Sequence, residues 1–294
     1  AAVRRFEGLL DDLEDRGLLW WDAAHDLYDL HPVVRGYAYA ALDPDARKLR
    51  HTRAYDLFDE QERAAPGGTP RVLADLALPL AMYDALIGAG RLDDAAELYA
   101  VRLGDPLLYT FAAYARIYAL LLPLFPDGLD RPPALTAARR QGGFASRMAS
   151  ALNGLRRDDE ALRLEGLVIG IYVEAADAPN LGVVLSNYAA SLRSLDRPAL
   201  ALRTYEDAQA LAAAADDRDR AAIAHMRLHS LYSTLGWTER ADAARAAFES
   251  APPAANTLTW RSAVARNHAW SLFRRGADDA AVRAALTEAE RLAE

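Results

Sequence analysis

The chain has 294 residues, a formal net charge of −8 and a hydrophobic content of 52%. This acidic balance argues against a nucleic-acid partner, because phosphate binding requires a cationic face. No run of eighteen apolar residues, no cysteine and no secretory leader occurs, so we expect no membrane span, disulfide or thiolate chemistry, and a cytoplasmic location.

Residues 1–42 are predicted to form a helix, a small β-hairpin and a second helix. Apolar residues follow a helical stripe up to Arg16, and Gly17 ends it. Two short β-like runs, Leu18–Trp21 and Leu27–Leu30, follow, and Pro32 then opens the second helix. Acidic residues outnumber the four arginines of this segment, which disfavours contact with DNA.

This segment resembles the end of a winged-helix domain. The string Leu-Glu-Asp-Arg-Gly-Leu-Leu before Trp20, together with Tyr-Asp-Leu-His-Pro-Val-Val-Arg ending at Arg35, is similar to the winged-helix segment that closes the nucleotide-binding module of STAND-type signalling ATPases of the NB-ARC class. The resemblance implies an upstream nucleotide-binding module in cis. It also implies that His31 senses the β-phosphate of bound ADP, although Leu30 and Pro32 flank it where that family has a Met-His-Asp-like motif.

The sequence contains no Gly-x-x-x-x-Gly-Lys-Ser/Thr motif. This chain alone is therefore expected to bind no cofactor, and ATP or ADP is expected only in a longer protein of which it would be a fragment. The alternative for His31 is a purely structural residue that ends a strand and precedes a helix.

Residues 43–122 are predicted to be an all-helical connector. Val72–Ala89 and Asp93–Leu103 form one irregular, repeat-like helix pair, and Tyr109–Leu122 forms a strongly apolar helix. Residues 123–142 are rich in Pro and Gly, and we expect a linker or a corner there, the best internal boundary in the chain.

Residues 143–294 repeat one pattern four times at a spacing of forty residues. Nine residues before each marker alanine stands a Leu or Tyr, and a short polar or glycine break lies between them; the alanines are Ala161, Ala201, Ala241 and Ala281. Each copy predicts two helices that become stable only when copies stack. The run Asn187–Asp196, followed by Ala199–Tyr205, resembles a tetratricopeptide repeat. The expected fold is therefore all-α: a solenoid of tetratricopeptide-like helix pairs preceded by a partial winged-helix segment with one hairpin.

Residues that could support catalysis are scarce, and no enzyme activity is expected of this chain. His225 and His229 stand four apart, a spacing found in zinc sites, but no acidic residue nearby completes a ligand set. We interpret them as surface or groove residues and expect no metal site. Three acidic pairs open second helices, where they cap amides and favour the helix dipole: Asp93–Asp94, Asp158–Asp159 and Asp278–Asp279.

The first helices of the repeats are free of acidic residues. Their cores, residues 143–155, 183–195, 223–235 and 263–275, hold no Asp or Glu, where the chain average predicts about seven. In tetratricopeptide-like stacks the first helices line the concave groove, so the resemblance implies a groove without carboxylates. We expect this groove to bind a protein or peptide with an acidic or carboxylate-bearing surface, through Arg147, Asn153, Asn187, Arg193, Arg227, Ser230, Arg266, Asn267, Trp270 and Arg274. The alternative is that these helices are more buried and carry less charge of either sign.

Two functions remain open from the sequence. The first is a non-catalytic sensor module of a STAND-type signalling ATPase, in which a ligand or partner in the repeat groove controls the nucleotide-dependent switch. The second is the effector-binding repeat domain of a winged-helix transcriptional regulator.

Overall fold

The computed structural model describes residues 2–22, 27–64, 68–251 and 258–292, and it divides into two compact units, Ala1–Leu103 and Gly104–Glu294. Helices dominate the described residues, beside a single two-stranded sheet. The predicted all-α class with one small hairpin is confirmed. The division between the units falls inside the expected connector, residues 43–122, and not in residues 123–142.

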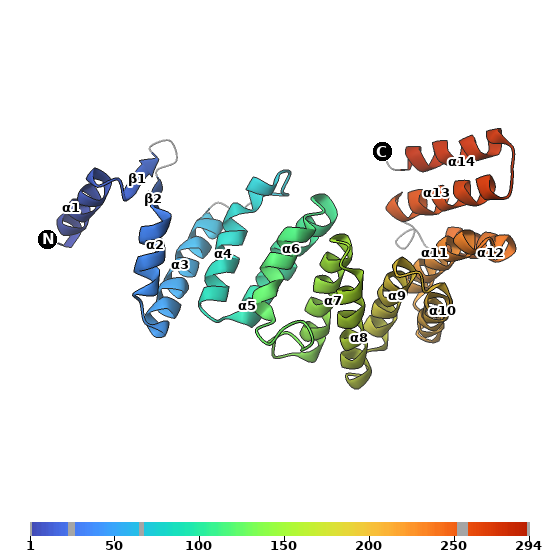
Figure 1. Ribbon diagram of the computed structural model, residues 1–294, viewed down its shortest axis with the longest axis horizontal. Coiled ribbons are helices and arrows are strands. Elements are labelled where there is room, and N and C mark those ends of the chain that lie inside the picture. The colour runs from blue at the N-terminus through green and yellow to red at the C-terminus, as the bar shows by residue number, and fades with distance from the viewer. Residues whose placement is uncertain (1, 23–26, 65–67, 252–257, 293–294) are drawn as a thin grey trace. The chain divides into compact units, whose positions relative to one another are not determined.

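The first unit begins with a helix, a hairpin and a helix (Figure 1): α1 (Ala2–Asp15), β1 (Leu19–Asp22), β2 (Leu27–Leu30) and α2 (Pro32–Ala40). The strands are antiparallel with Leu19 opposite Leu30, and the rings of Trp21 and Tyr28 stack at 6.2 Å. This order of elements is the predicted one, although residues 23–26 lie outside the described part of the chain. Leu19 is buried, whereas several large apolar side chains around it are exposed: Phe6, Trp20, Tyr28, Val33 and Tyr37.

Helices complete the first unit: α3 (Pro44–Ala64), the 3-10 turn η1 (Leu73–Leu76), α4 (Ala77–Gly88), α5 (Leu92–Leu98) and the π-helical η2 (Tyr99–Leu103). The expected repeat-like pair corresponds to α4 and α5. Tyr83 and Tyr99 anchor the core with 1% of each side chain exposed and ring centres 6.1 Å apart.

The second unit opens with a broken helix. The predicted single helix Tyr109–Leu122 is wrong: the chain forms the π-helical η3 (Pro106–Thr110), α6 (Tyr114–Leu121) and the short η4 (Leu122–Leu124). The break lies at Ala112, whose φ of 46° is left-handed. A left-handed alanine is costly, and neither Gly nor Pro marks this position in the sequence. Ala112 is exposed, and the amides of Phe111 and Ala113 close the end of η3 by donating to the carbonyls of Pro106 and Leu107.

The corner after α6 is packed. Leu124, Phe125 and Leu135 are each 4% exposed or less, and the amide of Ala134 donates to the carbonyl of Leu124 over 2.8 Å. Of the two expectations for residues 123–142, a linker or a corner, the described geometry fits a corner.

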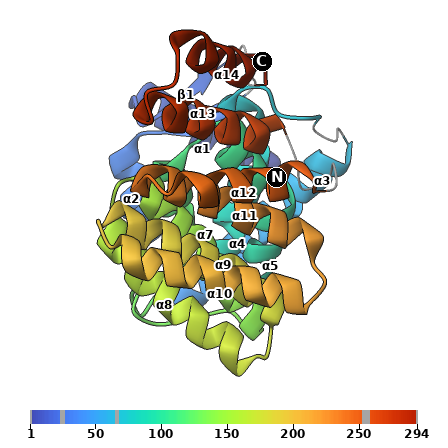
Figure 2. The same cartoon turned by 90° about the vertical axis from the view of Figure 1, so that its right-hand side faces the viewer.

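Eight helices follow as four pairs: α7 (Ala138–Gly154) with α8 (Asp158–Glu174), α9 (Ala178–Ser194) with α10 (Pro198–Ala214), α11 (Arg218–Leu235) with α12 (Thr238–Glu249), and α13 (Leu258–Arg274) with α14 (Asp279–Arg291). Figures 1 and 2 show the two helices of the α9–α10 pair side by side. The marker alanines Ala161, Ala201 and Ala241 have no exposed surface. The predicted register is confirmed, because these small residues stand where the helices of a pair meet.

One turn recurs after the helices of these pairs. In each copy of this turn one residue has a left-handed φ. Five of these residues follow one another at a spacing of twenty, and a sixth lies forty residues after the fifth: Arg156, Ala176, Asp196, Asp216, Gly236 and Gly276. At the start of the next helix an aspartate accepts a backbone hydrogen bond three residues on, as Asp177 does from Asn180 at 3.2 Å and Asp217 from Arg220 at 3.0 Å. Left-handed backbone thus ends these helices, and aspartate caps α9 and α11.

We expect the Ala176→Gly substitution to raise the free energy of unfolding by about 0.5–1 kcal/mol. Ala176 is exposed with a φ of 49°, a conformation that costs an alanine more than a glycine. Chemical denaturation followed by circular dichroism measures the difference. Gly236→Ala, at a φ of 77°, is the reciprocal control and should lower stability by a similar amount. Destabilisation by Ala176→Gly would contradict the assignment of strain to this turn.

Candidate functional site

A cavity of the second unit lies on the first helices of the repeats. It has a volume of about 610 Å³, a size typical of ligand-binding clefts. Helices α7, α9 and α11 supply most of its wall, and η3 and the start of α6 close one end. We call this cavity the first-helix groove. Its principal side chains are Leu108, Tyr109, Tyr114, Ser150, Asn153, Arg156, Asp158, Gly182, Ser186, Asn187, Ser191, Arg193, Arg220 and Arg227.

Small side chains on α9 hollow out the groove. Gly182, Ser186, Ala190 and Ser194 follow one another at a spacing of four residues, so they lie along one face of the helix. Their side chains are too short to fill the space above α9. This stripe was not singled out from the sequence, although its four-residue spacing is a visible signal.

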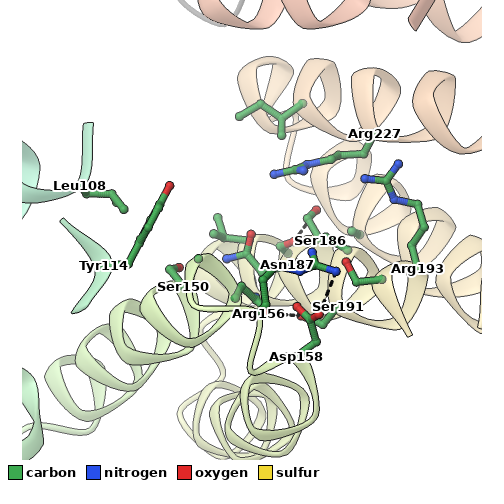
Figure 3. A pocket seen from close by; sticks show the side chains of 18 of the residues that line it. Leu108, Tyr114, Ser150, Arg156, Asp158, Ser186, Asn187, Ser191, Arg193 and Arg227 are labelled. Carbon is green, nitrogen blue, oxygen red and sulfur yellow. Dashed lines mark hydrogen bonds and ion pairs between the residues drawn. The ribbon is translucent and has the colours of Figure 1, made fainter. Parts of the chain in front are cut away.

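The two ends of the groove differ in chemistry. Figure 3 shows Leu108 and Tyr114 on one side and Arg193 and Arg227 on the other. Tyr114 packs closely on α7, because a Cβ added to Gly154 would lie 2.3 Å from its ring. The groove therefore has an apolar, aromatic end built by η3 and α6 and a cationic end built by α9 and α11.

Cationic groups outnumber carboxylates along the wall. Arg193 donates to the hydroxyl of Ser230 over 3.0 Å, which holds its guanidinium between α9 and α11. Arg156 pairs with Asp158 at 3.4 Å, and Arg220 pairs with Asp217 next to the groove. Of these carboxylates Asp158 lines the groove, together with four arginines. The local charge is positive within a chain of net charge −8.

A buried polar network lies beneath the groove. The Asn153 amide donates to Oε1 of Glu165 over 3.2 Å, and its Oδ1 accepts from the Ser191 hydroxyl at 3.2 Å. Glu165 comes from α8 and is 1% exposed. Burial raises the pKa of its carboxyl to about 7, against hydrogen bonds from Ser191 and Asn153 that lower it. Asn153 is therefore held by the scaffold on both sides of its amide while it also lines the groove.

Glu165 was missed at the sequence level because it lies on a second helix, where a glutamate is usually exposed. The repeat register was the available signal. Glu165 stands forty residues before Tyr205, which is also 1% exposed and fills the same position in the next repeat.

The structure brings together only part of the predicted site. Asn153, Asn187, Arg193 and Arg227 line the first-helix groove, and Ser230 supports it through Arg193. Arg147 does not line this groove: its guanidinium lies 5.3 Å from the ring centre of Phe144, over the preceding turn of α7. Four further predicted residues lie on α13, away from this cavity: Arg266, Asn267, Trp270 and Arg274.

The α13 residues present a separate surface. The rings of Trp270 and Phe273 stack at 5.7 Å, and 52% and 63% of these side chains are exposed. Arg274 donates to the carbonyl of Thr234 at the end of α11. The expectation of one groove shared by all four repeats therefore does not describe the cavity, which spans the first three.

The three histidines of the repeats are structural in their described contacts. His229 has no exposed surface, so its interpretation as a surface or groove residue is wrong. Its Nδ1 lies 2.9 Å from the carbonyl of Ala241, which can only accept, so this nitrogen carries the proton. His225 is half-buried and its Nε2 lies 3.5 Å from Gln209. No cluster of metal-ligating side chains occurs among the described residues.

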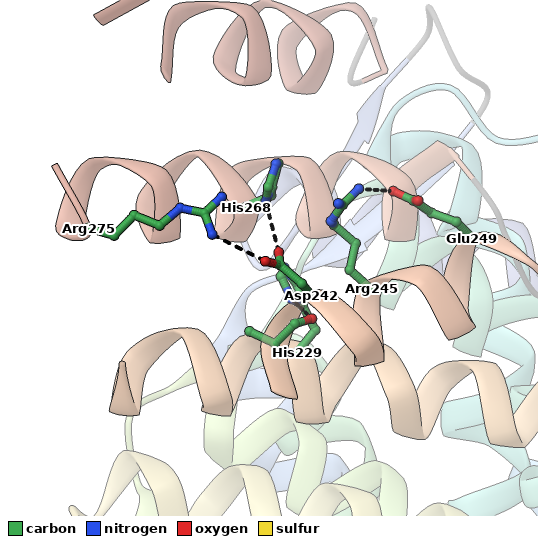
Figure 4. A network of polar contacts seen from close by, with 7 residues as sticks. His229, Asp242, Arg245, Glu249, His268 and Arg275 are labelled. Atoms are coloured by element: carbon green, nitrogen blue, oxygen red, sulfur yellow. Dashed lines mark hydrogen bonds and ion pairs between the residues drawn. The ribbon is translucent and has the colours of Figure 1, made fainter. Parts of the chain in front are cut away.

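Polar contacts tie the last two repeats together. Figure 4 shows Asp242 of α12 facing His268 of α13 and Arg275, which follows that helix. The distances are 4.0 Å to His268 and 3.2 Å to Arg275, and Arg245 pairs with Glu249 at 2.9 Å. Burial lowers the pKa of His229 and of His268. Both imidazoles therefore favour their neutral form, so the charged contact of Asp242 across these two repeats is its ion pair with Arg275.

His31 caps α2. Its Nδ1 accepts from the amide of Val33 at 3.3 Å, and the side chain is exposed. The acidic pairs lie in the first turns of α5 and α8 and at the start of α14, where Asp278 accepts from the amide of Ala281 over 2.7 Å. The placement agrees with the predicted interaction with the helix dipole. The predicted capping holds for Asp278, whereas no N-cap side chain caps the first amides of α5 or α8.

The stacked pairs define the class of the second unit, an α-solenoid of tetratricopeptide-like repeats. No described helix is long and apolar enough to cross a membrane.

No family model and no curated protein matches the chain. Among solved structures, BtubC (BKLC) from P. vanneervenii is similar at a TM-score of 0.48 and 17% identity, over 85% of this chain and 91% of that one. A kinesin light chain with nearly identical TPR-like repeats from Podosopora anserina gives a TM-score of 0.37 and 13% identity, over 74% and 95%. A point variant of that light chain gives 0.36 and 13%, over 74% and 97%.

Proposed function

We propose that the second unit is a non-catalytic interaction module whose first-helix groove binds a protein segment carrying carboxylates. The observation that carries this proposal is the charge of the groove wall, four arginines with one carboxylate, in an acidic protein. Guanidinium groups match carboxylates with paired N–H donors, and partial burial strengthens such charge-assisted hydrogen bonds. Asn187 adds an amide that can hold the main chain of an extended segment.

We further propose that this module serves a STAND-type signalling ATPase. In that arrangement, an upstream nucleotide-binding module in cis supplies the switch and partner capture in the groove biases it. The support for this step is the resemblance of residues 13–35 to the end of an NB-ARC winged helix and the helix–hairpin–helix order of residues 2–40. His31, exposed at the start of α2, would contact the β-phosphate of ADP there.

Charge reversal in the groove tests partner binding. We expect Arg193→Glu with Arg227→Glu to weaken binding of a fluorescein-labelled peptide of alternating Glu and Gly by at least about tenfold, because two charge-assisted contacts become repulsive. Fluorescence anisotropy measures the affinity. For the wild type, we expect a higher salt concentration to weaken binding, because salt screens the charges. A peptide with Gln in place of Glu should bind poorly to every variant.

Arg203→Glu is the matched control. Arg203 is exposed on α10 and does not line the groove, so this reversal places a carboxylate on the same unit without touching the site. Equal binding of the Glu and Gln peptides by the wild type would contradict the proposal. So would wild-type affinity in the double variant, and a double variant that unfolds would assign these arginines to the scaffold.

A further inference from the structure

A carboxyl group is buried directly under the first-helix groove. Glu165 on α8 is 1% exposed, its Oε1 accepts from Asn153, and its Oε2 has no hydrogen-bond partner among the described atoms. Burying an ionised carboxylate without a cationic partner is costly, so the neutral form is favoured. An ionised Glu165 therefore does not stabilise the repeat. A functional role would account for a carboxyl group at this position.

The charged and titratable groups around Glu165 do not compensate it. Asp158 of its own helix raises the pKa of Glu165, while α7 and α9 contribute the neutral Asn153 and Ser191. Tyr205 of α10 faces the carboxyl, and burial raises the pKa of that phenol, so it stays neutral. The positive charges of Arg227 on α11 and Arg193 on α9, which line the groove, lower the pKa of Tyr205 against the effect of burial. Helices α7 to α10 contain no histidine.

The groove and the buried carboxyl share two side chains. Asn153 and Ser191 both line the groove, and Asn153 bonds to Glu165 and to Ser191 at 3.2 Å each. A ligand atom that accepts a hydrogen bond from the Asn153 amide nitrogen lies within about two hydrogen-bond lengths of the carboxyl, roughly 6 Å. An anion there is repelled by an ionised Glu165 and not by a neutral one.

We propose that Glu165 links capture of a carboxylate-bearing segment to a proton, so that the groove binds this partner more tightly when Glu165 is neutral. The inference rests on the proposed function and adds its regulation. Because the pKa of Glu165 is about 7, the carboxyl is mostly neutral at pH 6 and mostly ionised at pH 8. Bound anion in turn favours the neutral form, so binding near neutral pH takes up a proton.

The test uses the Glu–Gly probe peptide at pH 6 and pH 8, because its carboxylates are ionised throughout this range. We expect wild-type affinity to be on the order of tenfold higher at pH 6, the size of a like-charge interaction in a partly solvated site. Glu165→Gln, which keeps the shape of the neutral carboxyl, should bind at pH 8 as the wild type does at pH 6. The histidines remain in this variant, so any pH dependence of the affinity that it retains is due to them.

Titration calorimetry of the wild type at pH 7.5, in two buffers of different ionisation enthalpy, provides a measurement that needs no variant. We expect net uptake of protons on binding. Equal wild-type affinity at both pH values with no proton uptake, or a Glu165→Gln variant that keeps the full pH dependence, would overturn the inference while leaving the proposed function standing. If the probe binds at neither pH, the proposed function fails and the proton linkage falls with it.

Discussion

Replacing Tyr205 with alanine is expected to lower the free energy of unfolding of the second unit by about 3–5 kcal/mol, the range for an aromatic side chain removed from a packed interior. Tyr205 is 1% exposed and belongs to a buried cluster that joins two repeats, with Leu192 from its own repeat and Leu228 and Leu231 from the next. Its loss leaves a cavity that neighbouring rigid helices cannot close. Chemical denaturation followed by circular dichroism measures the loss.

Tyr205→Phe separates the ring from its hydroxyl. This variant keeps the packing, so we expect a loss below about 1.5 kcal/mol. A small effect of Tyr205→Ala would contradict the assignment of this residue to the junction between repeats. A large effect of Tyr205→Phe would show that the polar side of the ring carries the stability.

Replacing Glu165 with glutamine is expected to stabilise the protein at high pH. The folded state raises the pKa of Glu165 from 4.5 to about 7, so it binds a proton more tightly than the unfolded chain. The stability that this group contributes is fully present below pH 4.5 and is lost as pH rises through 7. At pH 8 the wild type should therefore be less stable than the variant by about 3 kcal/mol, whereas at pH 4.5 the two should nearly coincide.

The measurement is denaturation of both proteins between pH 4.5 and 8. His229 and His268, with lowered pKa values, reduce stability as pH falls below 6.5, but both proteins carry them and the difference cancels their effect. Glu174→Gln, at the exposed end of the same helix, is the matched control and should show no such divergence. A Glu165→Gln variant that is less stable than the wild type at pH 8 would contradict this prediction, because it would show that the buried site accommodates the ionised carboxylate.

Structural features that recur in the repeats could be predicted from the sequence. The small marker residues Ala161, Ala201 and Ala241 recur at a spacing of forty residues, and the structure buries each of these three completely, whereas Ala281 of the last copy is half-buried. Helix–turn–helix spacing, the hairpin near the N-terminus and the acidic first turns follow from local chemistry in the same way. Such features need no knowledge of the neighbouring repeat.

The departures from the prediction lie where one copy differs from the others. The turn at Ala112 places a left-handed alanine where neither Gly nor Pro marks a break in the sequence. Arg147 stands forty residues before Asn187 and eighty before Arg227, yet it turns over Phe144 while the other two line the groove. Equivalent positions therefore define candidates for a site, and the side chains of adjacent helices decide which of them face the same cavity.

The uniform turn between helices determines how this protein can change in length. Asp177 and Asp217 stand forty residues apart, and each accepts a hydrogen bond from the amide three residues ahead of it, at the start of α9 and of α11. Removing residues 178–217 would join Asp177 to Arg218 and leave α11 with an equivalent aspartate cap and an equivalent turn before it. A gene that gains or loses about 120 base pairs, three for each of about forty residues, would thus add or remove a whole helix pair without disturbing the junction. Because the wall of the groove is made of such pairs, recombination within the coding sequence offers a route to grooves of different reach and charge.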